Sequence, residues 1–152
     1  MRLSGTRNTL TGASATCRSV KVFADTHYFI ALLSARDSAH EAAMAWKPEA
    51  TLREVVTTSW VLVELADSMN LPVERNAVAR FILRLRSDAK TRIVPVSEEL
   101  LWRGFELYRD RHDKEWSLTD CISFVVMGDE RITEALTRDH HFEQAGFAAL
   151  LK

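Results

Sequence analysis

The chain has 152 residues, a formal net charge of −1, 47% hydrophobic residues and 27% charged residues. This size suits one domain that buries a substantial core. The near-zero net charge argues against a protein that coats nucleic acid nonspecifically, because such proteins are usually basic overall; a local basic groove stays compatible with it. No run reaches the roughly 18 apolar residues that a membrane span requires.

The cysteines and the N-terminal segment bear on the cellular compartment. Cys17 and Cys121 lie far apart and match neither a disulfide framework nor a zinc-binding spacing, which indicates reduced thiols in a cytoplasmic protein. Residues 1–19 contain three arginines, no acidic residue and no apolar secretory core. We expect a flexible extension over residues 1–19 and one domain over residues 20–152. A transit peptide would share this composition, but a mobile tail or an upstream start codon is the favoured explanation.

Short apolar runs alternate with helix-like runs along the domain. The predicted strands cover residues 20–24, 54–58, 92–96 and 132–137, with a short final strand over 147–151. The predicted helices cover residues 26–33, 40–46, 59–70, 73–86, a long run that Ser97 opens, 117–127 and 139–145. This alternation predicts an α/β fold of three layers, α/β/α, around a parallel sheet of four or five short strands.

Particular residues set the expected boundaries. Pro48 is expected to stop the preceding helix, because the residue before a proline disfavours helical geometry. Ser59 is expected to cap the helix that follows the second strand. Pro95 lacks a backbone donor, so the third strand should lie at the edge of the sheet or end at this proline.

Four acidic residues stand where apolar runs break off, namely Asp25, Glu64, Asp120 and Asp139. Ligands of parallel α/β sheets bind beyond the carboxyl ends of the strands, so we expect the four carboxylates to gather on one rim. Converging carboxylates repel one another unless a cation neutralises them. Mg²⁺ or Mn²⁺ prefers oxygen ligands, and such ions promote phosphodiester cleavage. The pattern therefore predicts a metal-dependent nuclease.

Each acid also has a simpler explanation. Asp25 and Asp139 could each cap the helix that follows, which contributes about 1 kcal/mol. Asp120 forms a Ser-x-x-Asp capping pattern with Ser117. Glu64 could lie on a solvated helix face. Taken singly these alternatives stay open, and the case for a shared site rests on the four acids together.

The histidines offer a rival metal site that the spacing disfavours. His140 and His141 are adjacent, and on a helix they are expected to point in directions too different to chelate one ion. His27, His40 and His112 show no His-x-x-x-His spacing. We therefore expect surface or packing histidines and no zinc site.

Four segments resemble, in order and spacing, the four motifs of the PIN domain. They are residues 22–26 (VFADT), 58–65 (TSWVLVEL), 117–124 (SLTDCISF) and 136–142 (LTRDHHF). The resemblance extends from about Val20 to Leu151. Within that family the chain is most similar to VapC-type toxins of bacterial type II toxin–antitoxin pairs.

The resemblance implies a metal-dependent endoribonuclease. It makes Asp25 and Asp120 direct ligands of Mg²⁺ or Mn²⁺. It implies that Glu64 binds the metal or holds a metal-bound water, and that Asp139 completes the site. A water molecule would attack the RNA phosphodiester with no covalent enzyme intermediate. The number of metal ions and the RNA target stay open.

The resemblance also implies supporting residues and partners. Thr26 and Thr137 lie beside motif acids, where their hydroxyls are placed to position phosphate or water, and Thr137 is the better candidate. Toxins of this type are usually homodimers that a small antitoxin inhibits, often by inserting an arginine into the acidic groove. Two alternatives are an RNA-processing nuclease outside a toxin system and a PIN-like module that binds RNA or protein without cutting. The second would be expected to have lost an acid.

Candidate RNA-binding residues are basic side chains on two helix-like runs. They are Arg80, Arg84, Arg86, Arg109 and Arg111. The simpler interpretation is that charged residues on exposed helix faces are only solvated.

Overall fold

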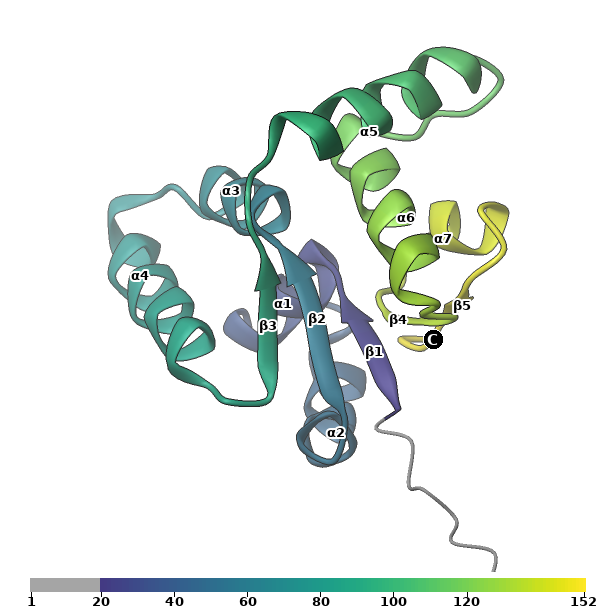
Figure 1. The fold of residues 1–152 in the computed structure, drawn as a ribbon. Coiled ribbons are helices and arrows are strands. Elements are labelled where there is room, and N and C mark those ends of the chain that lie inside the picture. The colour runs from purple at the N-terminus through teal and green to yellow at the C-terminus, as the bar shows by residue number, and fades with distance from the viewer. Residues whose placement is uncertain (1–19) are drawn as a thin grey trace, which may run out of the picture.

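A single parallel sheet organises the protein (Figure 1). The computed structural model describes residues 20–152, so the extension expected over residues 1–19 lies outside the described residues. The strand order is β3-β2-β1-β4-β5, and every neighbouring pair is parallel. The predicted α/β class is confirmed. The strands are β1 (Lys21–Ala24), β2 (Glu54–Thr58), β3 (Thr91–Val94), β4 (Glu134–Leu136) and β5 (Ala148–Ala149).

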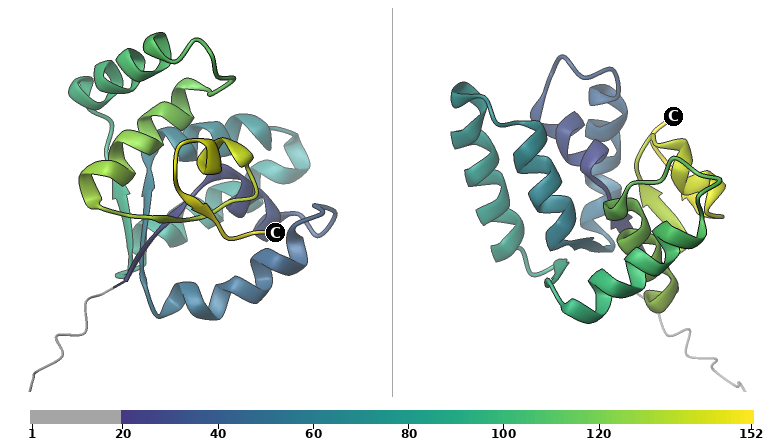
Figure 2. Two further views of the ribbon diagram at one scale, coloured as in Figure 1. Left: turned by 90° about the vertical axis from the view of Figure 1, so that its right-hand side faces the viewer. Right: turned by 90° about the horizontal axis from the view of Figure 1, so that it is seen from above.

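Helices cover both faces of the sheet (Figure 2). Helices α1 to α4 lie on one face, α6 and α7 lie on the other, and α5 packs along α6. Because all the strands are parallel, their carboxyl ends lie at one edge of the sheet. The bounds are α1 (Thr26–Leu33), α2 (His40–Thr51), α3 (Ser59–Ser68), α4 (Pro72–Ser87), α5 (Glu98–Asp110), α6 (Leu118–Glu130) and α7 (His140–Gln144).

Other helix ends shift by one to three residues, and two boundaries that particular residues were expected to set are wrong. Helix α2 continues through Pro48 to Thr51. A proline so near a helix end removes one backbone donor, and Trp46 anchors the segment because its indole N–H donates to the Leu150 carbonyl at 3.0 Å. The cap of α3 is Thr58, the last residue of β2, whose hydroxyl accepts the Val61 N–H at 3.1 Å. Ser59 is therefore the first helical residue and not the cap.

Strand β3 forms one edge of the sheet, as the position of Pro95 predicted. Strand β3 pairs with β2 alone among the described strands, and it ends at Val94, one residue before the proline. Both consequences expected of Pro95 are thus met: an edge strand and a strand end. The central strands β1 and β2 are buried along nearly their whole length, as a sheet covered on both faces requires.

The core lies between the sheet and its helices. Its largest fully buried side chains include Phe23, Phe29, Leu65, Met127 and Phe142. They come from β1, α1, α3, α6 and α7, so one continuous core holds both helical layers on the sheet. None of the helices within residues 20–152 is long and apolar enough to span a membrane.

Gly104 allows α5 to approach α6 closely. A Cβ atom at this buried position would meet the Ile122 side chain and would lie 3.2 Å from the Ile122 backbone nitrogen and Cα. Ile122 is fully buried two residues after Asp120. The contact therefore fixes the position of the helix that carries Asp120.

Substituting this glycine tests the helix contact. Gly104→Ala should lower the free energy of unfolding by about 1–3 kcal/mol, because overpacking displaces the rigid Ile122 backbone. Gly128→Ala on α6 is the matched control, since a Cβ there meets nothing within 4 Å. The control should be neutral or more stable, because alanine is the better helix former. Urea unfolding of both variants measures the difference, and equal effects would contradict the packing argument.

Candidate active site

Asp25 joins the end of β1 to the start of α1. Its carboxylate caps the helix by accepting the His27 backbone N–H at 3.5 Å, and it accepts the Thr137 hydroxyl at 2.8 Å. Its backbone N–H donates to the Leu136 carbonyl at 3.3 Å, which ties it to the end of β4. Only 3% of Asp25 is exposed. Asp25 is therefore a buried carboxylate held from two strands.

Thr137 connects Asp25 to Asp139. The fully buried Thr137 hydroxyl donates to Asp25 and accepts the Asp139 backbone N–H at 3.0 Å. Asp139 in turn caps α7, because its carboxylate accepts the His141 backbone N–H at 2.9 Å. One buried hydroxyl thus sets the relative position of two motif acids.

Asp120 lies in the first turn of α6 inside a capping box. The Ser117 hydroxyl accepts the Asp120 N–H at 3.0 Å, and the Asp120 carboxylate accepts the Ser117 N–H at 2.8 Å. The imidazole Nδ1 of His141 lies 3.3 Å from the Asp120 carboxylate and 3.4 Å from the Asp139 carboxylate. His141 therefore stands between the acids of the third and fourth motifs.

Glu64 reaches the same place from α3. Its carboxylate accepts a hydrogen bond from the buried Thr26 hydroxyl at the start of α1. Glu64 is half-buried, and Ser68, one turn later, lines the same pocket. Asp67 instead lines a separate hollow between α3 and α4. The alternative of a solvated helix face thus does not describe Glu64.

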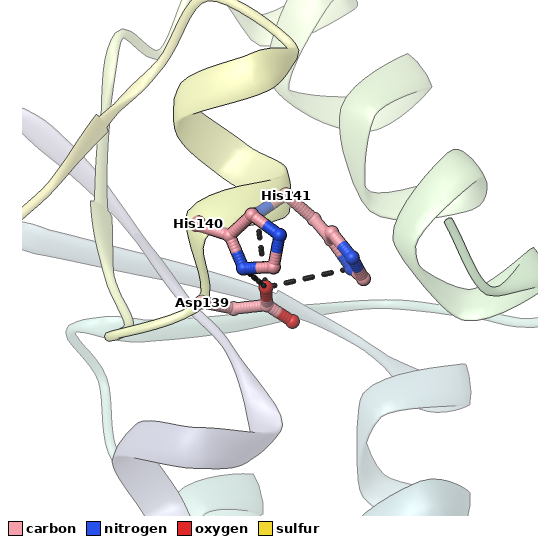
Figure 3. Close-up of side chains that lie close together, drawn as sticks. All are labelled: Asp139, His140 and His141. Atoms are coloured by element: carbon pink, nitrogen blue, oxygen red, sulfur yellow. Dashed lines mark hydrogen bonds and ion pairs between the residues drawn. The ribbon is translucent and has the colours of Figure 1, made fainter. Parts of the chain in front are cut away.

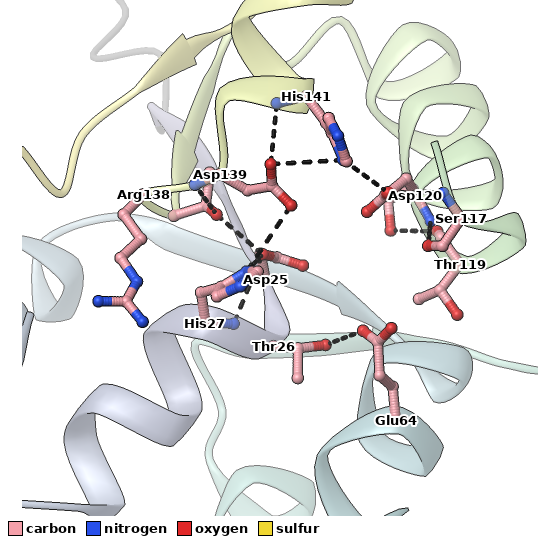
Figure 4. A network of polar contacts seen from close by, with 12 residues as sticks. Asp25, Thr26, His27, Glu64, Ser117, Thr119, Asp120, Arg138, Asp139 and His141 are labelled. Atoms are coloured by element: carbon pink, nitrogen blue, oxygen red, sulfur yellow. Dashed lines mark hydrogen bonds and ion pairs between the residues drawn. The ribbon is translucent and has the colours of Figure 1, made fainter. Parts of the chain in front are cut away.

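These side chains enclose one pocket of about 260 Å³ at the carboxyl ends of the strands (Figure 4). The structure brings all four predicted acids together, although they come from four separate segments. The residues that line this pocket are Asp25, Thr26, His27, Ile30, Glu64, Ser68, Glu115, Ser117, Asp120, Asp139 and His141.

Burial raises the pKa of two of these acids. The pKa of Glu64 is raised mainly by desolvation, against which the Thr26 hydrogen bond acts, and the charges of Asp25 and Asp120 raise it further. Desolvation also raises the pKa of Asp120; the Ser117 N–H opposes this, and nearby carboxylates add to it. Negative charge in the pocket is therefore only partly compensated by the side chains that line it.

Sequence reasoning missed His27 as part of the site. Its Nδ1 lies 3.0 Å from the Asp25 carboxylate and 4.0 Å from that of Asp139. The hydrogen bond to Asp25 raises the pKa of His27, against the opposing effect of burial. The available signal was its position two residues after a capping aspartate, where the side chain folds back over the cap.

The adjacent histidines lie closer together than the sequence predicted (Figure 3). His140 and His141 were expected to diverge, but their ring centroids lie 4.5 Å apart. Both Nδ1 atoms face one oxygen of Asp139, at 3.6 Å for His140 and 3.4 Å for His141. Possible ligand atoms of the three residues lie within 4.8 Å of one another. The shared carboxylate at the start of this short helix draws both rings to one side.

The predicted RNA-binding arginines do not line the acidic pocket. Arg109 and Arg111 are each paired with an acid at 2.9 Å, namely Asp110 and Asp113. Arg80 and Arg84 lie along α4. Arg86 lines a hollow beside Thr91, at the opposite end of β3 from the acids. An RNA-binding role for these five residues stays a prediction.

The family described as the PIN domain matches residues 22–148. The chain belongs to the PIN domain family. Among curated relatives, the 23S rRNA-specific endonuclease VapC20 of Mycobacterium tuberculosis, from strains CDC 1551 / Oshkosh and H37Rv, is 33% identical over 130 residues, which cover 83% of this chain and 95% of the relative.

Two solved structures share the fold of this chain. The crystal structure of Mycobacterium tuberculosis VapC20, described as a sarcin–ricin loop cleaving toxin, superposes with a TM-score of 0.75 and 27% identity, covering 84% of this chain and 96% of that one. FitAcB from Neisseria gonorrhoeae superposes with a TM-score of 0.59 and 19% identity over 86% of this chain and 96% of that one, a likeness of fold alone.

The raised pKa of Glu64 predicts a dependence of stability on pH. An acid whose pKa is higher in the folded state stabilises the fold while protonated, and this contribution is lost as pH rises through the folded pKa. Glu64→Gln stays neutral and keeps an oxygen acceptor for Thr26. In metal-free buffer at pH 7 the variant should therefore resist urea better than the unaltered protein.

The difference should shrink as pH falls below the ordinary Glu pKa of 4.5. Glu106→Gln, at an exposed position on α5, serves as the control and should show no such pH-dependent gap. Urea midpoints at pH 7 and pH 4 measure both variants. A Glu64→Gln protein less stable than the unaltered protein at pH 7 would show that ionised Glu64 is not destabilising.

Proposed function

We propose that the protein is a metal-dependent endoribonuclease that hydrolyses RNA phosphodiester bonds and acts as the toxin of a toxin–antitoxin pair. The observation that carries this proposal is the meeting of Asp25, Glu64, Asp120 and Asp139 in one pocket at the carboxyl ends of the strands. Membership of the PIN domain family and the similarity to VapC20 over nearly its whole length support it.

The donors in the pocket suit a divalent cation. Carboxylate oxygens are the ligands that Mg²⁺ and Mn²⁺ prefer, and the raised pKa of Glu64 and of Asp120 indicates charge that a cation would neutralise. We assign Asp25 and Asp120 as direct ligands, with Glu64 and Asp139 completing the site directly or through water. When bound, such a cation lowers the pKa of an attacking water and stabilises the charge that develops on the leaving oxygen.

Neighbouring residues hold these carboxylates in place. The Thr137 hydroxyl binds both the Asp25 carboxylate and the backbone N–H of Asp139. The Thr26 hydroxyl orients Glu64. The backbone N–H of Ser117 orients Asp120. None of the four carboxylates depends on the cation alone for its position. The chain therefore preorganises the pocket, and water can attack the phosphodiester with no covalent intermediate on the enzyme.

The sarcin–ricin loop of 23S rRNA is the first substrate to test. The relative VapC20 is described as cleaving this loop, and the chain covers 95% of that relative. Ribosomal RNA would be met in the cytoplasm, which is the location that we propose for the protein. Transfer RNA and messenger RNA are the alternatives, which mapping of the cut ends in total RNA would distinguish.

We further infer a homodimer that a small antitoxin protein inhibits. Three aromatic side chains on α5 support the dimer: Trp102 is 54% exposed, Tyr108 49% and Phe105 39%. Phe105 has ring contacts with both others, so they form one continuous apolar stripe. Stripes of this kind commonly mark protein–protein contacts. An antitoxin segment that carries a cation would suit the acidic pocket.

The retained acids distinguish this proposal from the alternatives. A PIN-like module that binds without cutting does not need all four carboxylates, whereas this chain keeps them and holds each one with a hydrogen bond. An RNA-processing nuclease would share the site but not the antitoxin. A neighbouring reading frame that encodes a small DNA-binding protein would favour the toxin.

Replacing the ligands tests the catalytic assignment. Asp25→Asn and Asp120→Asn keep the shape of each side chain but remove its charge. Each should lower the rate of cleavage of a sarcin–ricin loop hairpin, with Mg²⁺ or Mn²⁺ present, by at least about a hundredfold. EDTA should abolish cleavage by the unaltered protein. Gel analysis of end-labelled RNA measures these rates.

The matched control is Asp129→Asn on the same helix as Asp120. Asp129 is exposed and pairs with Arg103 at 2.7 Å, away from the pocket. This variant should cleave at the normal rate. Undiminished cleavage by Asp25→Asn or Asp120→Asn would refute the assignment, as would full activity in EDTA.

A further inference from the structure

One permanently charged cation, an arginine, stands among the labelled side chains around the acidic pocket (Figure 4). Arg138 lies on one side, whereas Asp120 and Glu64 lie on the other. RNA that enters such a pocket carries a negative charge on every nucleotide, so phosphates beside the one that is cut are repelled by the carboxylates. A cation at the rim would offset this repulsion and would decide where the strand lies.

The backbone of Arg138 is held firmly by its two neighbours. Thr137 is fully buried and bound to Asp25, and the Asp139 N–H donates to the Thr137 hydroxyl. Consecutive Cα atoms lie about 3.8 Å apart, so the base of the Arg138 side chain is fixed beside a proposed metal ligand.

The guanidinium has one hydrogen bond and one longer ion pair, both to the segment before α2. Its Nη1 donates to the Ser38 hydroxyl, and its Nη2 lies 3.6 Å from the Asp37 carboxylate, beyond normal hydrogen-bond length. The side chain is 40% exposed. Arg109 and Arg111, in contrast, each have a carboxylate at 2.9 Å. Among these three, Arg138 can turn toward a new anion at the lowest cost in broken ion pairs.

We propose that Arg138 binds the RNA backbone phosphate next to the phosphate that is cleaved. This inference rests on the proposed ribonuclease function and adds a substrate contact outside the four family motif acids. A guanidinium suits the role because its planar set of N–H donors matches two phosphate oxygens. Ser38 and Asp37 hold the side chain at the rim until the RNA phosphate replaces them.

The contact sets the side of the pocket along which the bound strand lies. With the cleaved phosphate at the acids, the neighbouring phosphate lies on the side formed by the start of α1 and the turn before α7. His27 lines this side, between Arg138 and Asp25. The side with Glu64 on α3 has a carboxylate and no labelled arginine, so it repels phosphate. The strand is therefore held from the Arg138 side.

Binding measurements in a non-cleaving background test the contact. The probe is a fluorescein-labelled sarcin–ricin loop hairpin, and every variant also carries Asp120→Asn. Arg138→Ala should weaken binding about tenfold, the loss expected for one charge-assisted hydrogen-bonded contact. The slope of log Kd against log salt should fall by about 0.7 to 1, which corresponds to one phosphate. Arg138→Lys should restore part of the affinity and the full slope.

Two controls separate the phosphate contact from other effects. Arg131→Ala removes the same charge at the opposite end of α6 from Asp120, about 16 Å away by helix rise, and should leave Kd unchanged. Ser38→Ala removes the resting partner but keeps the cation, so Kd should stay within about twofold if Arg138 acts on RNA. A loss equal to that of Arg138→Ala would instead mean that Arg138 only anchors the segment before α2, and would overturn the proposal.

The remaining outcomes separate a failure of the Arg138 phosphate contact from a failure of the ribonuclease function. If the unaltered protein cleaves RNA while Arg138→Ala binds with unchanged Kd and salt slope, the phosphate contact is wrong and the ribonuclease function stands. If the unaltered protein neither binds nor cleaves the hairpin or total RNA, both inferences are overturned.

Discussion

Burial of negative charge at one edge of the sheet is the constraint on which the rest of the structure depends. Asp25 and Asp120 are 3% and 8% exposed, and their charges act on each other and on Glu64. Such a group of carboxylates costs free energy unless hydrogen bonds and cations compensate it. Thr137, Ser117 and neighbouring backbone N–H groups supply part of the compensation. The incomplete balance is what makes the pocket suited to a divalent cation.

Structural and functional roles of the acids coincide in this fold. Asp25 and Asp139 cap α1 and α7, and Asp120 closes the capping box of α6. The capping explanation and the shared-site explanation are thus not alternatives. A helix that starts directly after a parallel strand places its cap at the carboxyl edge of the sheet, where ligands bind. The positive end of each helix dipole also favours a carboxylate there.

Local sequence signals predicted the layered fold and the meeting of the four acids, because strand ends and helix caps are encoded within a few residues. Contacts that depend on tertiary structure were not predictable in this way. The cap at Thr58 and the helix through Pro48 depend on how β2 and Trp46 are held. The closeness of His141 to Asp120 needs α6 and α7 to pack side by side, and no local spacing encodes it.

The central claim is that a divalent cation binds between the buried carboxylates. Crystals grown with Mn²⁺ and recorded at a wavelength where manganese scatters anomalously test it most directly. The account predicts an anomalous peak within about 2.5 Å of carboxylate oxygens of both Asp25 and Asp120, and loss of that peak in Asp120→Asn crystals. Manganese bound only at His140, or at no position near the four acids, would contradict it.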